Sequence, residues 1–172
     1  LNIKMSYSKL MSNLFLRHGE VQNDKDVFYA NLPGFYLSCK GEMQAKDAGI
    51  KIKEQFDIKN IISSPLLRAR QTAEIVNSVL KINITTSYKI IEWAGPSDWV
   101  GKTWDEIKLT QNFKNADDSP LNLMNTGESL KSVFDRFNNI YEKCENTLFV
   151  SHQDTIRAFT YYYLNDKDFT KN

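Results

Sequence analysis

Residues 13–20 read NLFLRHGE, a short and mostly apolar run that leads directly into arginine, histidine, glycine and glutamate. We expect residues 13–16 to form a strand, because a polar loop follows them through about Tyr36. The same order returns near the other end of the chain, where residues 147–150 (TLFV) precede Ser151 and His152. The chain has 2 histidines, and each of them therefore follows a predicted strand directly.

The segments between these two strands alternate between helical periodicity and short apolar runs. Strands or extended segments are predicted over residues 60–63 and 84–91, and helices over residues 38–55, 64–80, 103–109, 127–145 and 155–164. Ser64 is expected to cap its helix, with Pro65 as the first helical residue. A turn is expected at residues 98–101 and a loop over residues 112–126. This alternation predicts an α/β fold, a three-layer α/β/α sandwich with a mostly parallel central sheet.

The bulk composition limits what the protein can be. A length of 172 residues suits one domain over residues 1–172, with residues 1–12 as a flexible or added N-terminal segment. Lys and Arg number 22 and Asp and Glu 21, so no strong electrostatic field favours nucleic acid or a membrane as partner.

Cys39 and Cys144 are expected to be free thiols, because they form no disulfide-type or zinc-type motif. No apolar run reaches membrane-spanning length, and the start lacks a signal-peptide pattern, so a cytoplasmic location is expected.

Reactive side chains gather at one predicted edge of the sheet. His18, His152 and Arg17 lie at strand ends, Arg68 lies one turn into the helix after residues 60–63, and Glu92 ends the third extended segment. Ligands of parallel α/β sheets bind at the carboxyl ends of the strands, so these side chains are expected to meet.

This set of residue types is typical of phosphoryl transfer. Guanidinium groups bind phosphate oxygens through paired, charge-assisted hydrogen bonds, and imidazole can act as a covalent nucleophile. A second imidazole could stabilise the charge on the phosphoryl group, and a carboxylic acid could protonate the leaving oxygen. The helix that begins near Ser64 could add backbone amides. Two histidines with Glu92 could instead hold a metal, although two arginines oppose a cation. Ser63 or Ser151 as a nucleophile is weaker, because the chain has no GxSxG motif.

The motifs of the whole chain resemble the histidine phosphatase superfamily, which has the phosphoglycerate mutase-like fold. Six segments match it in order: residues 16–20 (LRHGE), 37–45 (LSCKGEMQA), 63–73 (SSPLLRARQTA), 92–107 around Glu92 and WVG, 127–136 (GES…R), and 151–158 (SH…IRA). Among its members, the small phosphatases of the alpha-ribazole phosphatase type are the most similar.

The resemblance implies a role for each site residue. His18 would be phosphorylated, while Arg17, Arg68 and His152 would bind the phosphoryl group. Glu92 would act as proton donor and then as base for water, and the Gly19 carbonyl would fix the tautomer of His18. No metal or cofactor is implied.

One polar phosphate contact is harder to place. The family's usual asparagine falls at Asp24, and the chain carries Asn23 one position earlier. An acid facing a phosphate is unfavourable, so Asn23 is the predicted contact. Val21, Val100 and Gln153 also depart from the family pattern, and they lie at the rim where substrate would be selected.

The sequence therefore predicts a metal-independent phosphomonoesterase that acts on a small phosphorylated metabolite through a phosphohistidine. Alternatives remain open. A phosphoglycerate mutase-type phosphotransferase is one, although such mutases are longer and shelter the phosphoenzyme from water. A protein phosphohistidine phosphatase is another, although Glu92 argues mildly against it. A non-catalytic phospho-ligand binding module is the third, although such a module would typically lose His18, Arg17 or His152. The natural substrate and the oligomeric state stay open.

Overall fold

A parallel sheet of four strands forms the centre of the protein. The computed structural model describes residues 12–115, 121–122 and 126–164. The strands are β1 (Leu14–Arg17), β2 (Asn60–Ser63), β3 (Asn83–Thr86) and β4 (Thr147–Ser151), in the spatial order β1-β4-β2-β3. Every neighbouring pair is parallel, and Arg17 of β1 is level with Ser151 of β4. The first and last strands of the chain are therefore neighbours, and their carboxyl ends coincide.

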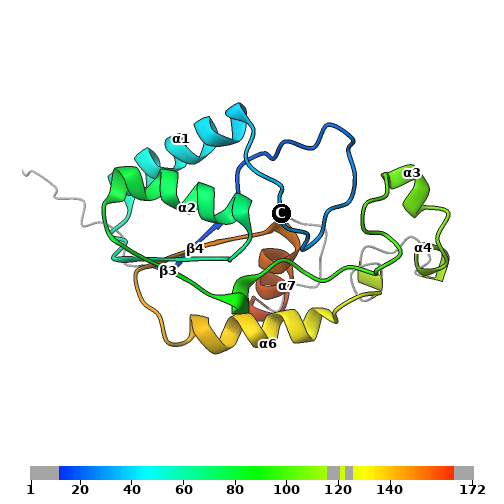
Figure 1. Ribbon diagram of the computed structural model, residues 1–172. Helices are drawn as coiled ribbons and strands as arrows, with labels where there is room; N and C mark the ends of the chain where they lie inside the picture. Colours follow the sequence, from blue (N-terminus) through cyan, green and yellow to red (C-terminus); the bar gives the residue numbers. More distant parts are fainter. Residues whose placement is uncertain (1–11, 116–120, 123–125, 165–172) are drawn as a thin grey trace, which may run out of the picture.

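Helices cover both faces of this sheet. Figure 1 shows α1 (Cys39–Gln55) and α2 (Leu67–Leu80) above it, and α6 (Leu130–Tyr141) and α7 (Gln153–Tyr163) below it. The short helices α3 (Trp104–Ile107) and α4 (Gln111–Asn115) lie beyond the carboxyl ends of the strands. The predicted three-layer α/β/α architecture with a parallel sheet is confirmed.

Side-chain caps explain where several helices begin. The Ser38 hydroxyl accepts a hydrogen bond from the Gly41 amide at the start of α1, and Ser129 does the same for Ser132 in α6. Thr103 and Glu106 form a reciprocal capping box around α3. The helix α2 ends at Leu80 as predicted, but its predicted start was wrong, because it begins at Leu67 without a side-chain cap.

The structure corrects three further boundaries. The strand predicted over residues 84–91 ends at Thr86, because Ser87 turns the chain into a 3-10 helix, η1 (Tyr88–Ile90), by accepting a hydrogen bond from the Lys89 amide. The loop predicted over residues 112–126 contains α4, while residues 116–120 and 123–125 lie outside the described part. The helix predicted over residues 127–145 is shorter, since Ser129 caps it and Tyr141 ends it.

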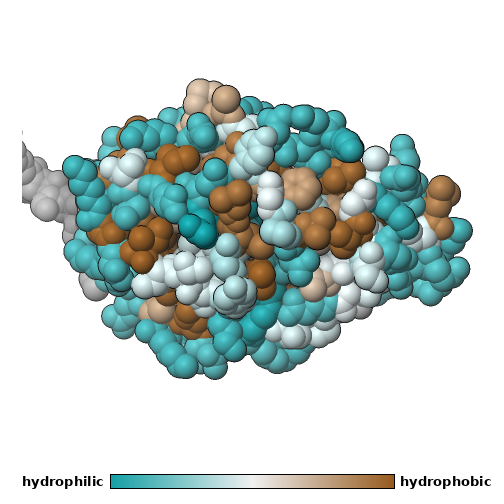
Figure 2. Space-filling view, in the orientation of Figure 1, coloured by the Kyte–Doolittle hydropathy of each residue, from teal (hydrophilic) through white to brown (hydrophobic). Residues whose placement is uncertain are grey.

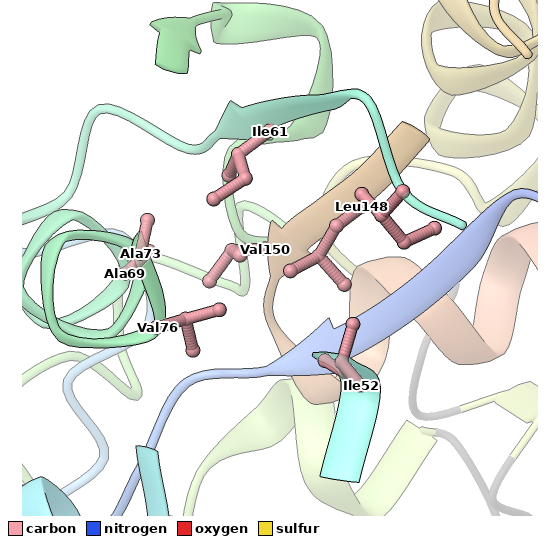
Figure 3. Close-up of a cluster of buried hydrophobic side chains, with 8 residues drawn as sticks. Ile52, Ile61, Ala69, Ala73, Val76, Leu148 and Val150 are labelled. Atoms are coloured by element: carbon pink, nitrogen blue, oxygen red, sulfur yellow. The ribbon is translucent and has the colours of Figure 1, made fainter. Parts of the chain in front are cut away.

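The core lies between the sheet and its helices. Figure 3 shows one cluster in which side chains of α1 and α2 face those of β2 and β4, namely Ile52, Ala69, Ala73, Val76, Ile61, Leu148 and Val150. A second cluster on the other face contains Ile62, Ile90, Phe137, Phe149 and Phe159. Burial on both faces explains why β4 is apolar at three successive positions. On the face shown in Figure 2, hydrophobic residues form scattered patches among hydrophilic ones.

Three further predictions concern the N-terminal segment, membrane-spanning helices and the cysteines. Residues 1–11, which make up most of the segment expected to be flexible, lie outside them. Within the described residues, no helix is both long enough and apolar enough to cross a membrane. Cys39 is exposed and Cys144 half-buried, and both are free thiols as expected.

Candidate active site

The two histidines meet at the carboxyl ends of β1 and β4, as the sequence predicted. Their ring centroids are 5.2 Å apart, with the rings inclined at 62°. The backbone amide of His18 donates to the Ser151 carbonyl at 3.0 Å, which extends the ladder between the strands by one hydrogen bond. Sheet pairing therefore holds the backbone next to both histidines, so the distance between the two residues is set by the sheet and not by a loop.

His18 is held in one tautomer by its neighbour. Its Nδ1 lies 2.7 Å from the Gly19 carbonyl oxygen, which can only accept a hydrogen bond. The proton of the neutral ring is therefore on Nδ1, and Nε2 keeps its lone pair. Burial, against the opposing effect of the Gly19 carbonyl and with help from the positive charges of Arg68 and Arg17, lowers the pKa of His18 to about 4. The ring is thus neutral and nucleophilic at neutral pH.

Close packing of the backbone explains why the residue after His18 is a glycine. A Cβ at this position would lie 2.4 Å from the Gly41 carbonyl oxygen, and one at Gly41 would lie 2.1 Å from the Glu20 carbonyl oxygen. Both distances are far below van der Waals contact, so neither position has room for a side chain. The loop after β1 therefore packs backbone to backbone against the first turn of α1.

His152 is completely buried, and one of its ring nitrogens has a partner. Its Nε2 lies 2.7 Å from the Ser64 hydroxyl, while its Nδ1 has no hydrogen-bond partner among the described residues. Burial and the positive charge of Arg68 lower its pKa well below the usual value. The Leu66 amide donates to the Ser64 oxygen at 3.4 Å, which leaves the hydroxyl proton for Nε2. In that tautomer, Nδ1 carries a proton and can donate it to a ligand.

Arg68 is also completely buried, and the loop between β1 and α1 holds its guanidinium. Nη2 donates to the Ala30 carbonyl at 2.5 Å and Nη1 to the Leu32 carbonyl at 3.2 Å, while Nε has no partner among the described residues. A buried donor without an acceptor is costly. The two buried side-chain atoms without a partner in the described part of the chain are thus Arg68 Nε and His152 Nδ1. Both belong to residues for which the sequence predicted phosphate contacts.

Two adjoining cavities open onto His18. One of about 630 Å³ is lined by residues that include Arg17, His18 and Tyr29, and a second of about 270 Å³ shares these three and adds Glu92 and Asp154. Arg17 is exposed, unlike Arg68. A ligand on the His18 ring would therefore have Arg17 beside it and space on both sides.

Glu92 is held against the first turn of α7. Its Oε1 accepts hydrogen bonds from the Trp93 amide at 2.8 Å and from the amide and hydroxyl of Thr155 at 3.3 and 3.2 Å. Its Oε2 lies 3.9 Å from His152 Nδ1. Burial and, to a smaller extent, the negative charge of Asp154 raise the pKa of Glu92 to about 8. At neutral pH this carboxyl group is protonated and can act as an acid.

An ion pair between Arg136 and Glu128 fixes the segment that carries Glu92. Arg136 contacts both carboxylate oxygens of Glu128, at 2.8 and 3.1 Å, and the Glu128 carbonyl accepts a hydrogen bond from the Trp93 indole at 2.7 Å. Ser129 caps α6, as expected for helix-start chemistry. The Arg136–Glu128 pair and the Ser129 cap therefore support the site without being part of it.

Asn23 is the site residue whose predicted role finds least geometric support. Its amide donates to the Val27 carbonyl at 2.9 Å and its oxygen accepts from the Val27 amide at 3.2 Å. The side chain lines both cavities, but its polar atoms already hold a turn of the loop. Asp24 is exposed and pairs with Gln22. A phosphate contact from Asn23 stays a prediction.

Sequence reasoning missed several residues of the site. Ser64 was expected to cap a helix but orients His152, and Thr155 was not considered although it anchors Glu92. Asp154 was also missed, and burial raises its pKa. All three lie within a few positions of a predicted site residue in the sequence, and this nearness was the signal that could have identified them. Tyr29 was missed too, because nothing in its surrounding sequence singles it out.

Comparison with known proteins identifies the family of this chain. Residues 14–170 match the family model described as Histidine phosphatase superfamily (branch 1). An uncharacterized protein of Mycobacterium tuberculosis, Rv0525, is 38% identical over 108 residues, which cover 58% of this chain and 52% of that protein. The chain thus spans about half the length of the first curated relatives it matches. The Escherichia coli protein named "Probable phosphoglycerate mutase GpmB" is 30% identical over 148 residues, covering 80% of this chain and 67% of that protein.

Solved structures share the fold. YhfR of Bacillus stearothermophilus superposes with a TM-score of 0.74 at 26% identity, covering 90% of this chain and 80% of that one. An Escherichia coli protein assigned as an alpha-ribazole-5'-P phosphatase has a TM-score of 0.71 at 21% identity, covering 90% and 79% of the two chains. The match of residues 14–170 takes in every strand of the sheet and both histidines at its edge. The chain therefore belongs to the histidine phosphatase superfamily, branch 1.

Proposed function

We propose that this protein hydrolyses a small phosphomonoester, without a metal, through a phosphohistidine formed on His18. The observation that carries the proposal is the pair of buried donors, Arg68 Nε and His152 Nδ1, which find no acceptor in the described part of the chain and lie beside a neutral imidazole. A phosphoryl group offers the anionic oxygens that both donors require. The positive charges of Arg17 and Arg68 would balance its negative charge, so the side chains of the protein can bind the phosphoryl group without a metal ion.

The first chemical step follows from the tautomer of His18. Its Nε2 attacks phosphorus while the ester P–O bond breaks, and Gly19 accepts the Nδ1 hydrogen bond of the resulting imidazolium. Glu92, whose pKa is about 8, gives its proton to the leaving oxygen. His152 stabilises the charge on the transferring phosphoryl group.

The second step returns the enzyme to its starting state. Glu92, now a carboxylate, takes a proton from water, and the water oxygen attacks phosphorus as the P–Nε2 bond breaks. Inorganic phosphate leaves, His18 is again neutral, and Glu92 is again protonated. A family relative named as a phosphoglycerate mutase supports one alternative, in which a second metabolite hydroxyl replaces water as acceptor.

The test is turnover of p-nitrophenyl phosphate in the presence of a metal chelator. We expect the wild type to be active and His18→Ala to be inactive while still folded by circular dichroism. Acid-stable protein phosphate is not expected, because phosphohistidine is acid-labile, so the intermediate is sought by mass spectrometry at alkaline pH. Normal turnover in His18→Ala contradicts the nucleophile assignment.

Two further assays decide between the candidate functions. A 3-phosphoglycerate assay primed with 2,3-bisphosphoglycerate detects mutase activity, which would displace the phosphatase proposal if it exceeded hydrolysis. A panel of phosphorylated metabolites identifies the substrate class. Absence of turnover across the whole panel, together with retained phosphate binding, would favour a binding module.

A further inference from the structure

Tyr29 lies where the two cavities at His18 join. The cavities of about 630 and 270 Å³ share a small group of lining residues, namely Arg17, His18, Asn23, Asp26 and Tyr29. A phosphoryl group on His18 Nε2 would occupy this junction. Any other residue of the shared group with a suitable polar atom is therefore a candidate phosphate ligand.

Packing on two sides fixes the ring of Tyr29. It lies over the Arg68 guanidinium, with 4.7 Å between the guanidinium carbon and the ring centroid. It also stacks on Phe35 with centroids 4.6 Å apart and an angle of 26° between the planes. These two contacts leave the phenol few positions. Arg17 lines the same two cavities, so Tyr29 has the buried arginine of the site against its ring and the exposed arginine at the same junction.

Asn23, the other amide or hydroxyl side chain that lines both cavities, is already engaged, and so are two carbonyls of the loop. The Asn23 amide is bonded at both ends to Val27, and the Ala30 and Leu32 carbonyls accept from Arg68. The carboxylate of Asp26, at the same junction, would repel a phosphate. The Tyr29 hydroxyl is therefore the loop donor that is best placed to meet a phosphoryl oxygen.

We infer that the Tyr29 hydroxyl donates a hydrogen bond to the phosphoryl group held between His18 and Arg17, an assignment that rests on the proposed function. Tyr29 would then supply the polar contact that the sequence placed at Asn23. Burial raises the pKa of Tyr29, while the positive charges of Arg68 and Arg17 oppose that rise, so the phenol remains a protonated donor at neutral pH.

The test compares two variants that each remove one phenolic oxygen. Tyr29→Phe keeps the ring over Arg68 and deletes only the hydroxyl. Tyr36→Phe is the matched control, because this tyrosine lies on the same loop but is 53% exposed and outside the lining of both cavities. Inorganic phosphate binding is measured by calorimetry, and orthovanadate inhibition is measured with p-nitrophenyl phosphate as substrate.

In Tyr29→Phe we expect phosphate and vanadate to bind roughly 10- to 100-fold more weakly, as for a lost hydrogen bond to a charged acceptor. Tyr36→Phe should match the wild type, and thermal melting should be the same in all three proteins. Unchanged binding in Tyr29→Phe overturns the inference, as does weaker binding accompanied by an equal loss in Tyr36→Phe. Calorimetry needs no turnover, so a wild type that binds phosphate through Tyr29 but hydrolyses nothing would refute the proposed function alone.

Discussion

Asp154→Asn is expected to move the alkaline limit of activity to lower pH. Burial and the negative charge of Asp154, in that order, raise the pKa of Glu92 to about 8. A general acid works only while it is protonated, so kcat/KM should fall as the pH rises past this value. Removing the charge of Asp154 lowers the pKa of Glu92, and the fall should therefore begin earlier.

The expected size follows from how the two carboxyl groups are placed. Thr155, the residue after Asp154, donates two hydrogen bonds to Glu92. The carboxyl group of Glu92 therefore lies against the first turn of α7, which also carries Asp154. Since burial is the larger cause, Asp154 accounts for the smaller part of the rise. Its loss should lower the pKa of Glu92 by about one unit, or ~1.4 kcal/mol.

The assay is kcat/KM against pH with a phosphate ester of a poor leaving group, such as phenyl phosphate, at constant ionic strength. Asp135→Asn serves as the control, because it removes the same charge from an exposed position on α6. Helix α7 loses a favourable charge at its N-terminus, worth roughly 0.3–1 kcal/mol, so melting temperatures are recorded as well. An alkaline midpoint that stays in place in Asp154→Asn, or shifts equally in Asp135→Asn, would refute the reasoning.

Three further predictions test the geometry of the site. Arg68→Ala should lower kcat/KM by roughly 100- to 1000-fold, as for loss of an oxyanion donor, whereas Arg70→Ala, at an exposed position, should not; equal rates would contradict the pocket. Ser64→Ala removes the hydroxyl that holds His152 and should cost about 1–3 kcal/mol in kcat/KM, with a KM close to that of the wild type; full activity would show that His152 needs no support. Gly41→Ala would place a methyl group 2.1 Å from a carbonyl oxygen of the β1–α1 loop and should lower the melting temperature measured by calorimetry; an unchanged melting temperature would show that the loop can retreat.

Much of the fold was predictable, because the information is local. An apolar run followed by polar residues identifies a strand and its carboxyl end, which is why β1, β2 and β4 were placed to within one residue. The predicted start of α2 was wrong because one side chain had a choice of partners. The Ser64 hydroxyl could have capped α2, but it pairs with His152, which is 88 residues away in the chain.

The sequence by itself determined the parallel α/β fold and the edge at which His18 and His152 meet, since strand ends follow from local patterns and the carboxyl ends of parallel strands lie at one edge of the sheet. Only the tertiary structure decided which atoms remain available to a ligand. Asn23 turned out to hold a turn, Arg68 to be tied to loop carbonyls, and Asp154 to lie beside Glu92. These outcomes depend on contacts between residues far apart in the chain and on burial, which sets pKa values, and neither is encoded in the residues next to each group.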